Sequence, residues 1–351
     1  MTFEEARAAF PVLERFAFLN AGSNGPLARA TVEAMLAEEL LDVARGRGGA
    51  PYFESVLALR EEARARLARV LGVEPERVAL TRSTTESCNI VLSGLGLGPD
   101  AEIVTSDEEH FGLLGALHAS AARVRVAPAD RIVEAVSERT RLIAISHVSW
   151  VTGKSLEPAR VKAETGLPVL VDGAQAVGAI PVEVGELDFY AISCQKWLCG
   201  PDVTGALFVA EPDKLRVALP SYLSQVEYAP DGSFVPKEGA ARFDSGWLGA
   251  ASLAGLVAAL GGAPDWRFER GAEIAGRCRE ALAERFEVVT KPGQSGLVSF
   301  RPAGDPEETV ARLYARDVVV RAIPGKDLIR VSCGYWTSEE DVERLLAGLA
   351  S

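Results

Sequence analysis

The chain has 351 residues, of which 25% are charged and 48% hydrophobic, with 33 glycines and 19 prolines. This is the composition of a globular protein and excludes a collagen-like or low-complexity chain, and the length predicts about two domains. The formal net charge is −12, so the surface repels phosphate backbones and we expect no nucleic-acid partner.

The cysteines, the first residues and one uncharged stretch indicate in which compartment the protein lies. The chain has five cysteines, an odd number scattered along it: Cys88, Cys194, Cys199, Cys278 and Cys333. This is typical of a reduced, cytoplasmic protein, and without a second pair at zinc-ligand spacing we expect no metal. The first residues have no basic or strongly apolar segment, so we expect no secretory signal. Residues 245–264 are uncharged but mostly Gly, Ala and Ser between Asp244 and Asp265, which predicts a buried helix rather than a membrane span.

Apolar, β-branched runs alternate with helical patterns up to about residue 210. The predicted strands are Val78–Thr81, Glu102–Ser106, Arg123–Ala127, Leu142–Ser149, Pro168–Asp172, Phe189–Ser193 and Gly205–Val209. The predicted helices between them are Glu86–Leu95, Gly112–Ala122, Asp130–Glu138 and Glu157–Thr165. Most of these strands are continuously apolar, as strands covered on both faces are, so the pattern predicts a mainly parallel, doubly wound α/β sheet.

The pattern changes after Val209. A loop-rich stretch, Pro220–Asp244, precedes the uncharged helix. The remaining predicted elements are a charged helix, three strands and a closing helix: Arg267–Phe286, Gly296–Arg301, Val318–Ala322, Leu328–Ser332 and Ser338–Leu349. We therefore divide the chain into an N-terminal segment, 1–17, that packs on the small domain, a large α/β domain, 18–245, and a small C-terminal α+β domain, 246–351.

Two residues stand out at the carboxyl ends of predicted strands, where open α/β sheets bind ligands. Lys196, one of seven lysines, follows an apolar strand beside Trp197 and Leu198, where desolvation lowers the pKa of an amine and lets it react with a carbonyl. Asp172 ends another apolar strand, and a buried carboxylate there needs a cation such as a protonated ring nitrogen. Taken singly, Lys196 is better explained as a snorkelling lysine on a loop. The ordinary alternative for Asp172 is a helix cap or turn residue.

Two further segments also follow strands. Ser83 and Glu86 fit a capping box, so a helix begins at Thr84, and its free N–H groups with the hydroxyls of Thr84 and Thr85 suit a phosphate. His110 follows the next strand, where its ring can lie flat on an aromatic cofactor. The ordinary alternatives are a capped helix without a ligand and a structural loop histidine.

Together these segments resemble the class V aminotransferase family of fold type I pyridoxal 5′-phosphate (PLP) enzymes, which includes cysteine desulfurases, selenocysteine lyases and isopenicillin N epimerases. The resemblance runs from about Phe18 to Leu349. Its most specific part is the pair of motifs VDGAQAVGAIPVEV and SCQKWLCGPDVTGALFV, in that order and with the family's separation between Asp172 and Lys196. It implies the fold type I architecture, PLP as cofactor, a small amino acid as substrate, and a homodimer with the active site at the interface.

The resemblance also implies a role for each matching residue. Lys196 holds the cofactor as a Schiff base and moves the proton, Asp172 pairs with the ring nitrogen, and His110 stacks on the ring. The other implied cofactor ligands are Thr84, Thr85, Gln175, Ser193 and Gln195, with Ser245 reaching the phosphate of the other subunit. The implied substrate-binding residues are Asn20, Trp150, Arg321 and Arg330, of which Arg330 holds the substrate carboxylate.

Three departures from the family pattern restrict which reactions of the family we expect. Gln195 stands where many relatives have a histidine, and Trp150 where many have an asparagine that contacts the substrate carboxylate. The expected mobile loop between Arg321 and Arg330 contains no cysteine, whereas desulfurases need one to accept sulfur. A persulfide-forming desulfurase is therefore disfavoured.

The implied chemistry has several outcomes. Lys196 removes the Cα proton of an amino acid while the protonated ring takes up the electrons. We place transamination first, Cβ–S or Cβ–Se lyase second and epimerase third. An NAD-dependent oxidoreductase is a remote alternative, because the glycine-rich residues 94–98 close a helix instead of opening one. A non-catalytic PLP-binding protein is disfavoured by the intact lysine, aspartate and arginine positions.

Overall fold

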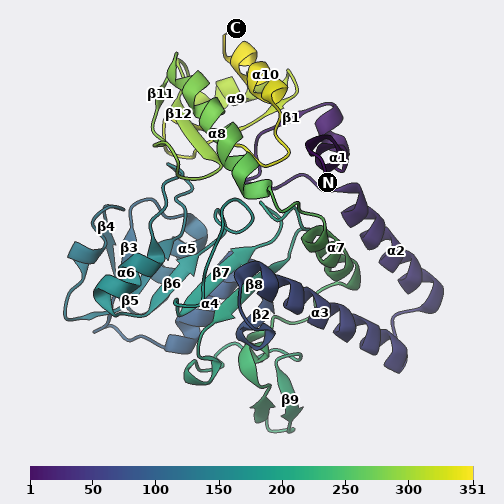
Figure 1. Cartoon of the computed structure of the whole chain (residues 1–351). Helices are drawn as coiled ribbons and strands as arrows, with labels where there is room; N and C mark the ends of the chain where they lie inside the picture. Colours follow the sequence, from purple (N-terminus) through teal and green to yellow (C-terminus); the bar gives the residue numbers. More distant parts are fainter. Residues whose placement is uncertain (351) are drawn as a thin grey trace.

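Seven strands form the central sheet of the structure, a computed structural model that describes residues 1–350 (Figure 1). In spatial order they are β2 (Val78–Thr81), β8 (Gly205–Val209), β7 (Phe189–Ser193), β6 (Val169–Asp172), β5 (Thr140–Ser146), β3 (Glu102–Ser106) and β4 (Arg123–Ala127). β8 is antiparallel to both of its neighbours, and the other adjacent pairs are parallel. The predicted mainly parallel α/β sheet is confirmed.

Helices cover both faces of this sheet because successive strand residues point into two different apolar cores. Val169 and Val171 of β6 enter one core, and Leu170 enters the other. The first core is shared with α3 (Gly49–Leu71), α6 (Pro158–Thr165) and α7 (Ala250–Gly261), and the second with α4 (Thr84–Leu95) and α5 (Phe111–Ala119). The uncharged segment thus forms a helix, α7, that packs on the sheet and on α2 (Arg29–Arg45).

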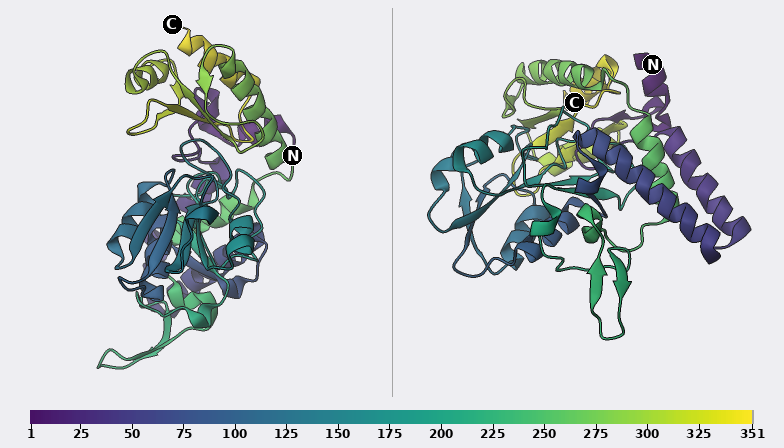
Figure 2. Two further views of the ribbon diagram at one scale, coloured as in Figure 1. Left: turned by 90° about the vertical axis from the view of Figure 1, so that its left-hand side faces the viewer. Right: turned by 60° about the horizontal axis from the view of Figure 1, so that its bottom comes forward.

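A second, four-stranded antiparallel sheet lies in the C-terminal part of the chain (Figures 1 and 2). Its strands are β11 (Glu287–Val288), β12 (Leu297–Arg301), β15 (Ile329–Ser332) and β14 (Arg321–Ala322). They share a third apolar core with α8 (Arg267–Ala283), α9 (Pro306–Tyr314) and α10 (Glu339–Leu349).

The N-terminal segment lies against this C-terminal part. β1 (Ala17–Phe18) pairs with β13 (Val318–Val319), and Arg7 of α1 (Phe3–Ala8) forms an ion pair with Asp341 at 2.6 Å. The predicted domain boundaries stay predictions, and α7, which we assigned to the small domain, contributes to the core of the large sheet.

Several local predictions are wrong. Residues 130–138 form only a short 3₁₀ turn, Val133–Ala135, because Ser137 bonds to Glu102 and Thr140 and ends it at once. The predicted strand Val318–Ala322 is split between two sheets, since β13 pairs with β1 and β14 with β15.

Other elements end early or were not expected. β5 ends at Ser146 rather than at residue 149, and the long helices α2 and α3 and the helix α9 were not predicted. The loop-rich stretch contains a hairpin, β9 (Gln225–Tyr228) with β10 (Phe234–Pro236), that projects from the body (Figures 1 and 2). Across residues 1–350, no helix is both long and apolar enough to cross a membrane.

Candidate active site

A cavity of about 240 Å³ opens where the parallel strands of the central sheet end. Eleven of the predicted site residues line it: Thr84, Thr85, His110, Trp150, Asp172, Gln175, Ser193, Gln195, Lys196, Arg321 and Arg330. They come from the segments after β2, β3, β5, β6 and β7 and from the strands β14 and β15. The tertiary structure therefore brings together residues that are up to 246 positions apart, as ligand sites of open α/β sheets require.

The Lys196 amine lies in this cavity. Within residues 1–350 it has no hydrogen-bond or ion-pair partner. Burial lowers the pKa of the Lys196 ammonium to about 8, the positive charges of Arg330 and Arg321 act in the same direction, and Asp172 opposes them. A fraction of the amine is therefore neutral near physiological pH, and a neutral amine is the form that attacks a carbonyl.

Asp172 is only 6% exposed and ends β6 at the cavity. One of its oxygens accepts the N–H of Ala174 at 2.9 Å, and no cationic group of the described chain lies within ion-pair distance. The backbone of Gly173 passes close to the ring of Tyr190, because a Cβ on Gly173 would lie 2.0 Å from that ring. A buried carboxylate without a cation is suited to a cationic ligand.

Gln175 is oriented by two neighbours. Its Nε2 donates to the carbonyl of Gly22 at 2.8 Å, and its Oε1 accepts from the indole of Trp197 at 3.0 Å. An amide nitrogen carries two hydrogens, so Gln175 keeps one donor for a ligand.

The N-terminus of α4 supplies a cluster of hydroxyls. Ser83 caps the helix by accepting the N–H of Glu86 at 3.1 Å, and the hydroxyls of Thr84 and Ser193 are 2.7 Å apart. The other half of the predicted capping box is wrong, since the Glu86 carboxylate accepts from the N–H and guanidinium of Arg82 and from the hydroxyl of Ser245. The free N–H of Thr85 and the hydroxyls at this end suit a phosphate.

His110 is positioned by a buried neighbour that our reading of the sequence did not single out. Glu109 accepts hydrogen bonds from the hydroxyls of Ser106 and Ser146 and so ties the end of β3 to the end of β5. Burial raises the pKa of Glu109 to about 7 against the effect of these bonds. A glutamate in the polar motif DEEHF gives no sign of burial, because the contact with Ser146 exists only once the strands are adjacent.

The His110 ring faces the cavity in a neutral form. It caps α5 by accepting the N–H of Gly112 at 3.0 Å, and it lies edge-on to Trp150 with ring centroids 5.0 Å apart. Burial and the charge of Lys196 lower the pKa of His110. A neutral imidazole here is available to lie against an aromatic ligand.

Two arginines form the wall opposite these groups. Arg330 is 1% exposed and donates to the carbonyl of Trp150 at 3.1 Å and to Ser23 at 3.5 Å. Arg321 donates to the same Ser23 hydroxyl at 3.0 Å. Burial and the neighbouring Arg321 lower the pKa of Arg330 to about 9. Such a guanidinium is suited to bind a carboxylate.

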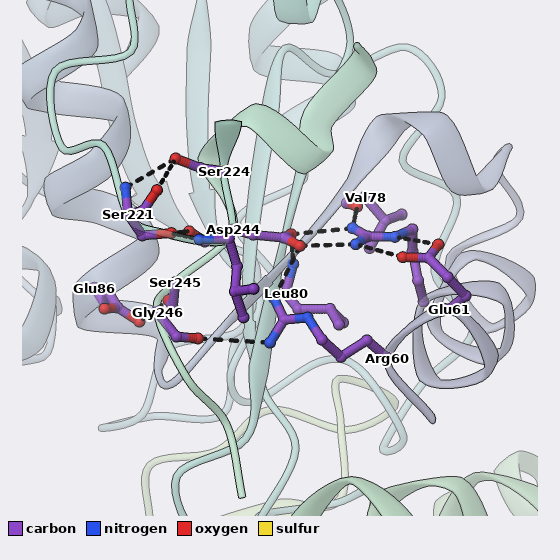
Figure 3. Close-up of polar contacts among 12 residues, drawn as sticks. Arg60, Glu61, Val78, Leu80, Glu86, Ser221, Ser224, Asp244, Ser245 and Gly246 are labelled. Carbon is purple, nitrogen blue, oxygen red and sulfur yellow. Dashed lines mark hydrogen bonds and ion pairs between the residues drawn. The ribbon is translucent and has the colours of Figure 1, made fainter. Parts of the chain in front are cut away.

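Two predicted residues lie outside the lining of this cavity. Asn20 contacts the cavity lining only through Ser23, because its side-chain oxygen accepts a hydrogen bond from the Ser23 hydroxyl at 2.8 Å. Ser245 follows Asp244, which Arg60 and Arg64 hold in place, and it bonds to Glu86 behind the N-terminus of α4 (Figure 3). Its predicted contact with the phosphate of a second subunit stays a prediction.

These features fit PLP. The buried Asp172 matches a protonated pyridine nitrogen, the N-terminus of α4 with Thr84 and Ser193 matches a phosphate, and the unpaired Lys196 matches an aldehyde. The three groups lie around one cavity.

Comparisons with known proteins show the family of this chain. The family model described as "Aminotransferase class-V" matches residues 29–345. The isopenicillin N epimerase of Streptomyces clavuligerus is 30% identical over 99% of this chain and 97% of its own length. A probable cysteine desulfurase of Methanothermobacter thermautotrophicus is 30% identical over 74% of this chain and 70% of its own length.

Solved structures of C-DES, a cystine C–S lyase, also match. One, a lysine-to-alanine mutant with glycine linked to the PLP cofactor, has a TM-score of 0.91 and 27% identity and covers 98% of this chain and 99% of C-DES. The complex with the product cysteine persulfide has a TM-score of 0.90 and 28% identity and covers 97% of this chain and 99% of C-DES. The chain therefore belongs to the class V aminotransferase family of PLP-dependent enzymes.

Proposed function

We propose that this protein is a PLP-dependent Cβ–S lyase that releases the sulfur with its product instead of passing it to an enzyme cysteine. All five cysteines are buried, and in the part of the chain that the structure describes none lines the cavity. Burial also raises the pKa of the Cys88, Cys194 and Cys199 thiols, and a thiol that is not ionised is a poor sulfur acceptor. The similarity to a desulfurase and to a cystine lyase supports sulfur chemistry.

The proposed steps divide among the residues of the cavity. When bound, PLP supplies a carbonyl for an amine and a protonated ring that accepts electrons from Cα. Asp172 would keep the ring nitrogen protonated, and Gln175 and His110 would orient the ring. Thr84, Thr85, Ser193 and Gln195 would hold the phosphate.

Substrate binding and proton transfer fall to two further residues. Arg330 holds the substrate carboxylate, with Trp150 at its side, and so directs Cα toward Lys196. The neutral Nζ of Lys196 takes the Cα proton and then delivers a proton to the departing sulfur. General acid–base catalysis of this kind contributes about 10²- to 10⁴-fold.

Transamination, which the sequence placed first, is the second candidate. It is favoured by the single amine of the site, because one base suffices to move a proton from Cα to the cofactor. Epimerisation with two bases needs another base on the opposite face of Cα, and among the described residues that line the cavity only His110 is also a neutral base. The proposal assigns His110 to the ring.

We also propose a homodimer in the cytoplasm. Val32, Leu36, Leu40 and Val43 of α2 are 39% to 84% exposed and lie at helical spacing on one face. Trp247, 44% exposed, lies beside the aromatic rings at the start of α3. An apolar face of this kind marks an interface, and we propose that a second copy covers it. The free cysteines support a reducing compartment.

A product screen tests the proposed reaction. The holoenzyme should show a visible absorbance band that borohydride fixes on Lys196. It is then incubated with a panel of sulfur amino acids, including cystine. Pyruvate formed together with a thiol, or with a persulfide when cystine is the substrate, supports the lyase. A keto acid formed with the aminated cofactor supports transamination, and loss of optical activity alone supports epimerisation. If the protein shows no such absorbance band, the lyase, transaminase and epimerase proposals are all refuted.

A further inference from the structure

The two arginines of the cavity face each other across a strand pair. Arg321 on β14 and Arg330 on β15 are register partners in the antiparallel sheet. Directly opposite residues extend from the same face of a sheet, and both line the cavity. Like charges in this position destabilise the pair, and Arg330 is almost fully buried. The arrangement needs a compensating anion.

The chain itself does not supply that anion. Within residues 1–350, neither guanidinium has a carboxylate at ion-pair distance, and both donate to the neutral hydroxyl of Ser23. The Ser23 hydrogen is committed to Asn20, so its oxygen accepts from both arginines. Gly22 leaves room for this, since a Cβ there would lie 2.7 Å from Nη2 of Arg330. The loop thus holds two cations side by side without neutralising them.

One carboxylate does not need both cations. A guanidinium binds a carboxylate through two parallel hydrogen bonds, so Arg330 alone suffices for the carboxylate of an amino acid. Asp172 is the one carboxylate among the described residues that line the cavity, and it is assigned to the cofactor ring. The positive charge of Arg321 therefore has no anion assigned to it. Nη1 of Arg321 and Nη2 of Arg330 are at most 6.5 Å apart, because both contact the Ser23 hydroxyl oxygen, at 3.0 and 3.5 Å respectively.

We propose that Arg321 binds a second acid group at the far end of the substrate, so that the substrate is an α-amino acid with a distal carboxylate. This inference rests on the proposed function, in which Arg330 binds the α-carboxylate. For a lyase, it selects sulfur amino acids with a carboxylate beyond the sulfur. Arg321 then determines specificity rather than chemistry.

The test compares amino acids of equal length with and without the second acid. The holoenzyme is titrated with L-norleucine and L-2-aminoadipate, and binding is followed by the change in cofactor absorbance, which does not require turnover. Shorter and longer pairs (norvaline with glutamate, 2-aminoheptanoate with 2-aminopimelate) cover the unknown distance. We expect the wild type to prefer the diacid of the best pair by roughly tenfold or more.

Variants of both arginines assign that preference. Arg321→Gln should reduce the preference to about one, and Arg321→Lys should keep part of it, because the charge remains without the fork. Arg330→Gln is the matched control, which should weaken both members of the pair and keep their ratio. The cofactor absorbance of each variant verifies that it is folded.

Each result decides the matter. No preference in the wild type for any pair, or an unchanged preference in Arg321→Gln, overturns the second-acid site while the amino-acid site stands. If no amino acid changes the cofactor absorbance of the wild type, the proposed function fails and the inference fails with it.

Discussion

Asp244 is the buried centre of an ion-pair network, and we expect its removal to destabilise the whole large sheet (Figure 3). Its two oxygens accept four hydrogen bonds: from Arg60 at 2.9 Å, from Arg64 at 3.1 and 2.8 Å, and from the N–H of Leu80 at 2.8 Å. The three charged side chains are between 0% and 4% exposed. Burial alone would lower the pKa of Arg64, but Asp244 and Glu61 raise it, so the Arg64 guanidinium stays charged.

Substituting Asp244→Ala leaves the buried Arg60 without a carboxylate and Arg64 with only the exposed Glu61 as an ion-pair partner. Breaking a buried pair in this way costs about 3–5 kcal/mol, because the remaining charge is neither solvated nor neutralised. Asp244→Asn should lose less, since an amide oxygen can still accept from Leu80. The free energy of unfolding is measured by urea titration of the holoenzyme at a fixed PLP concentration, because ligand binding adds to apparent stability.

The control is an ion pair on the outer surface of the same helix. Arg66 and Glu62 form a pair at 2.6 Å on α3 with side chains 30% and 46% exposed, and Glu62→Ala should leave stability close to wild type because solvent screens the pair. A loss below about 1 kcal/mol for Asp244→Ala, the size of an ordinary substitution, would refute the reasoning. It would mean that water solvates the two arginines or that rearranged side chains neutralise them.

Three further predictions concern the site. The rate at which the cofactor-free protein forms a Schiff base with PLP should rise about tenfold per pH unit and level off above about pH 8, because the pKa of Lys196 is lowered to about 8 and only the neutral amine reacts. The control is a free lysine amine, whose pKa is about 10.4. Identical pH profiles for the protein and the free amine would contradict the lowered pKa. Gly173→Ala should lower the free energy of unfolding by about 1–3 kcal/mol and weaken PLP retention, because its Cβ would overlap the ring of Tyr190; Gly185→Ala, which meets no atom within 4 Å, should do neither. Arg330→Ala should raise KM at least about tenfold through the loss of charge-assisted bonds while PLP affinity changes little, and equal losses of both would refute its assigned role.

The sequence alone determined the features that depend on short stretches of chain. Continuously apolar strands predicted a parallel sheet, and because the carboxyl ends of parallel strands share one edge, Asp172, Lys196, His110 and Thr84 could be assigned to one site. Failures were local too: residues 130–138 have a helical pattern, but Ser137 bonds to Glu102 and ends the turn.

Only the tertiary structure decided how distant segments meet. The register of β14 and β15 places Arg321 opposite Arg330, and a shift of one residue would turn one of them to the other face of the sheet. Ser23, some 300 positions earlier, contacts both, and Glu109 is buried only because β3 and β5 are adjacent. Charge and burial at these positions arise from neighbours that the folded chain brings together, and no pattern along the sequence encodes them.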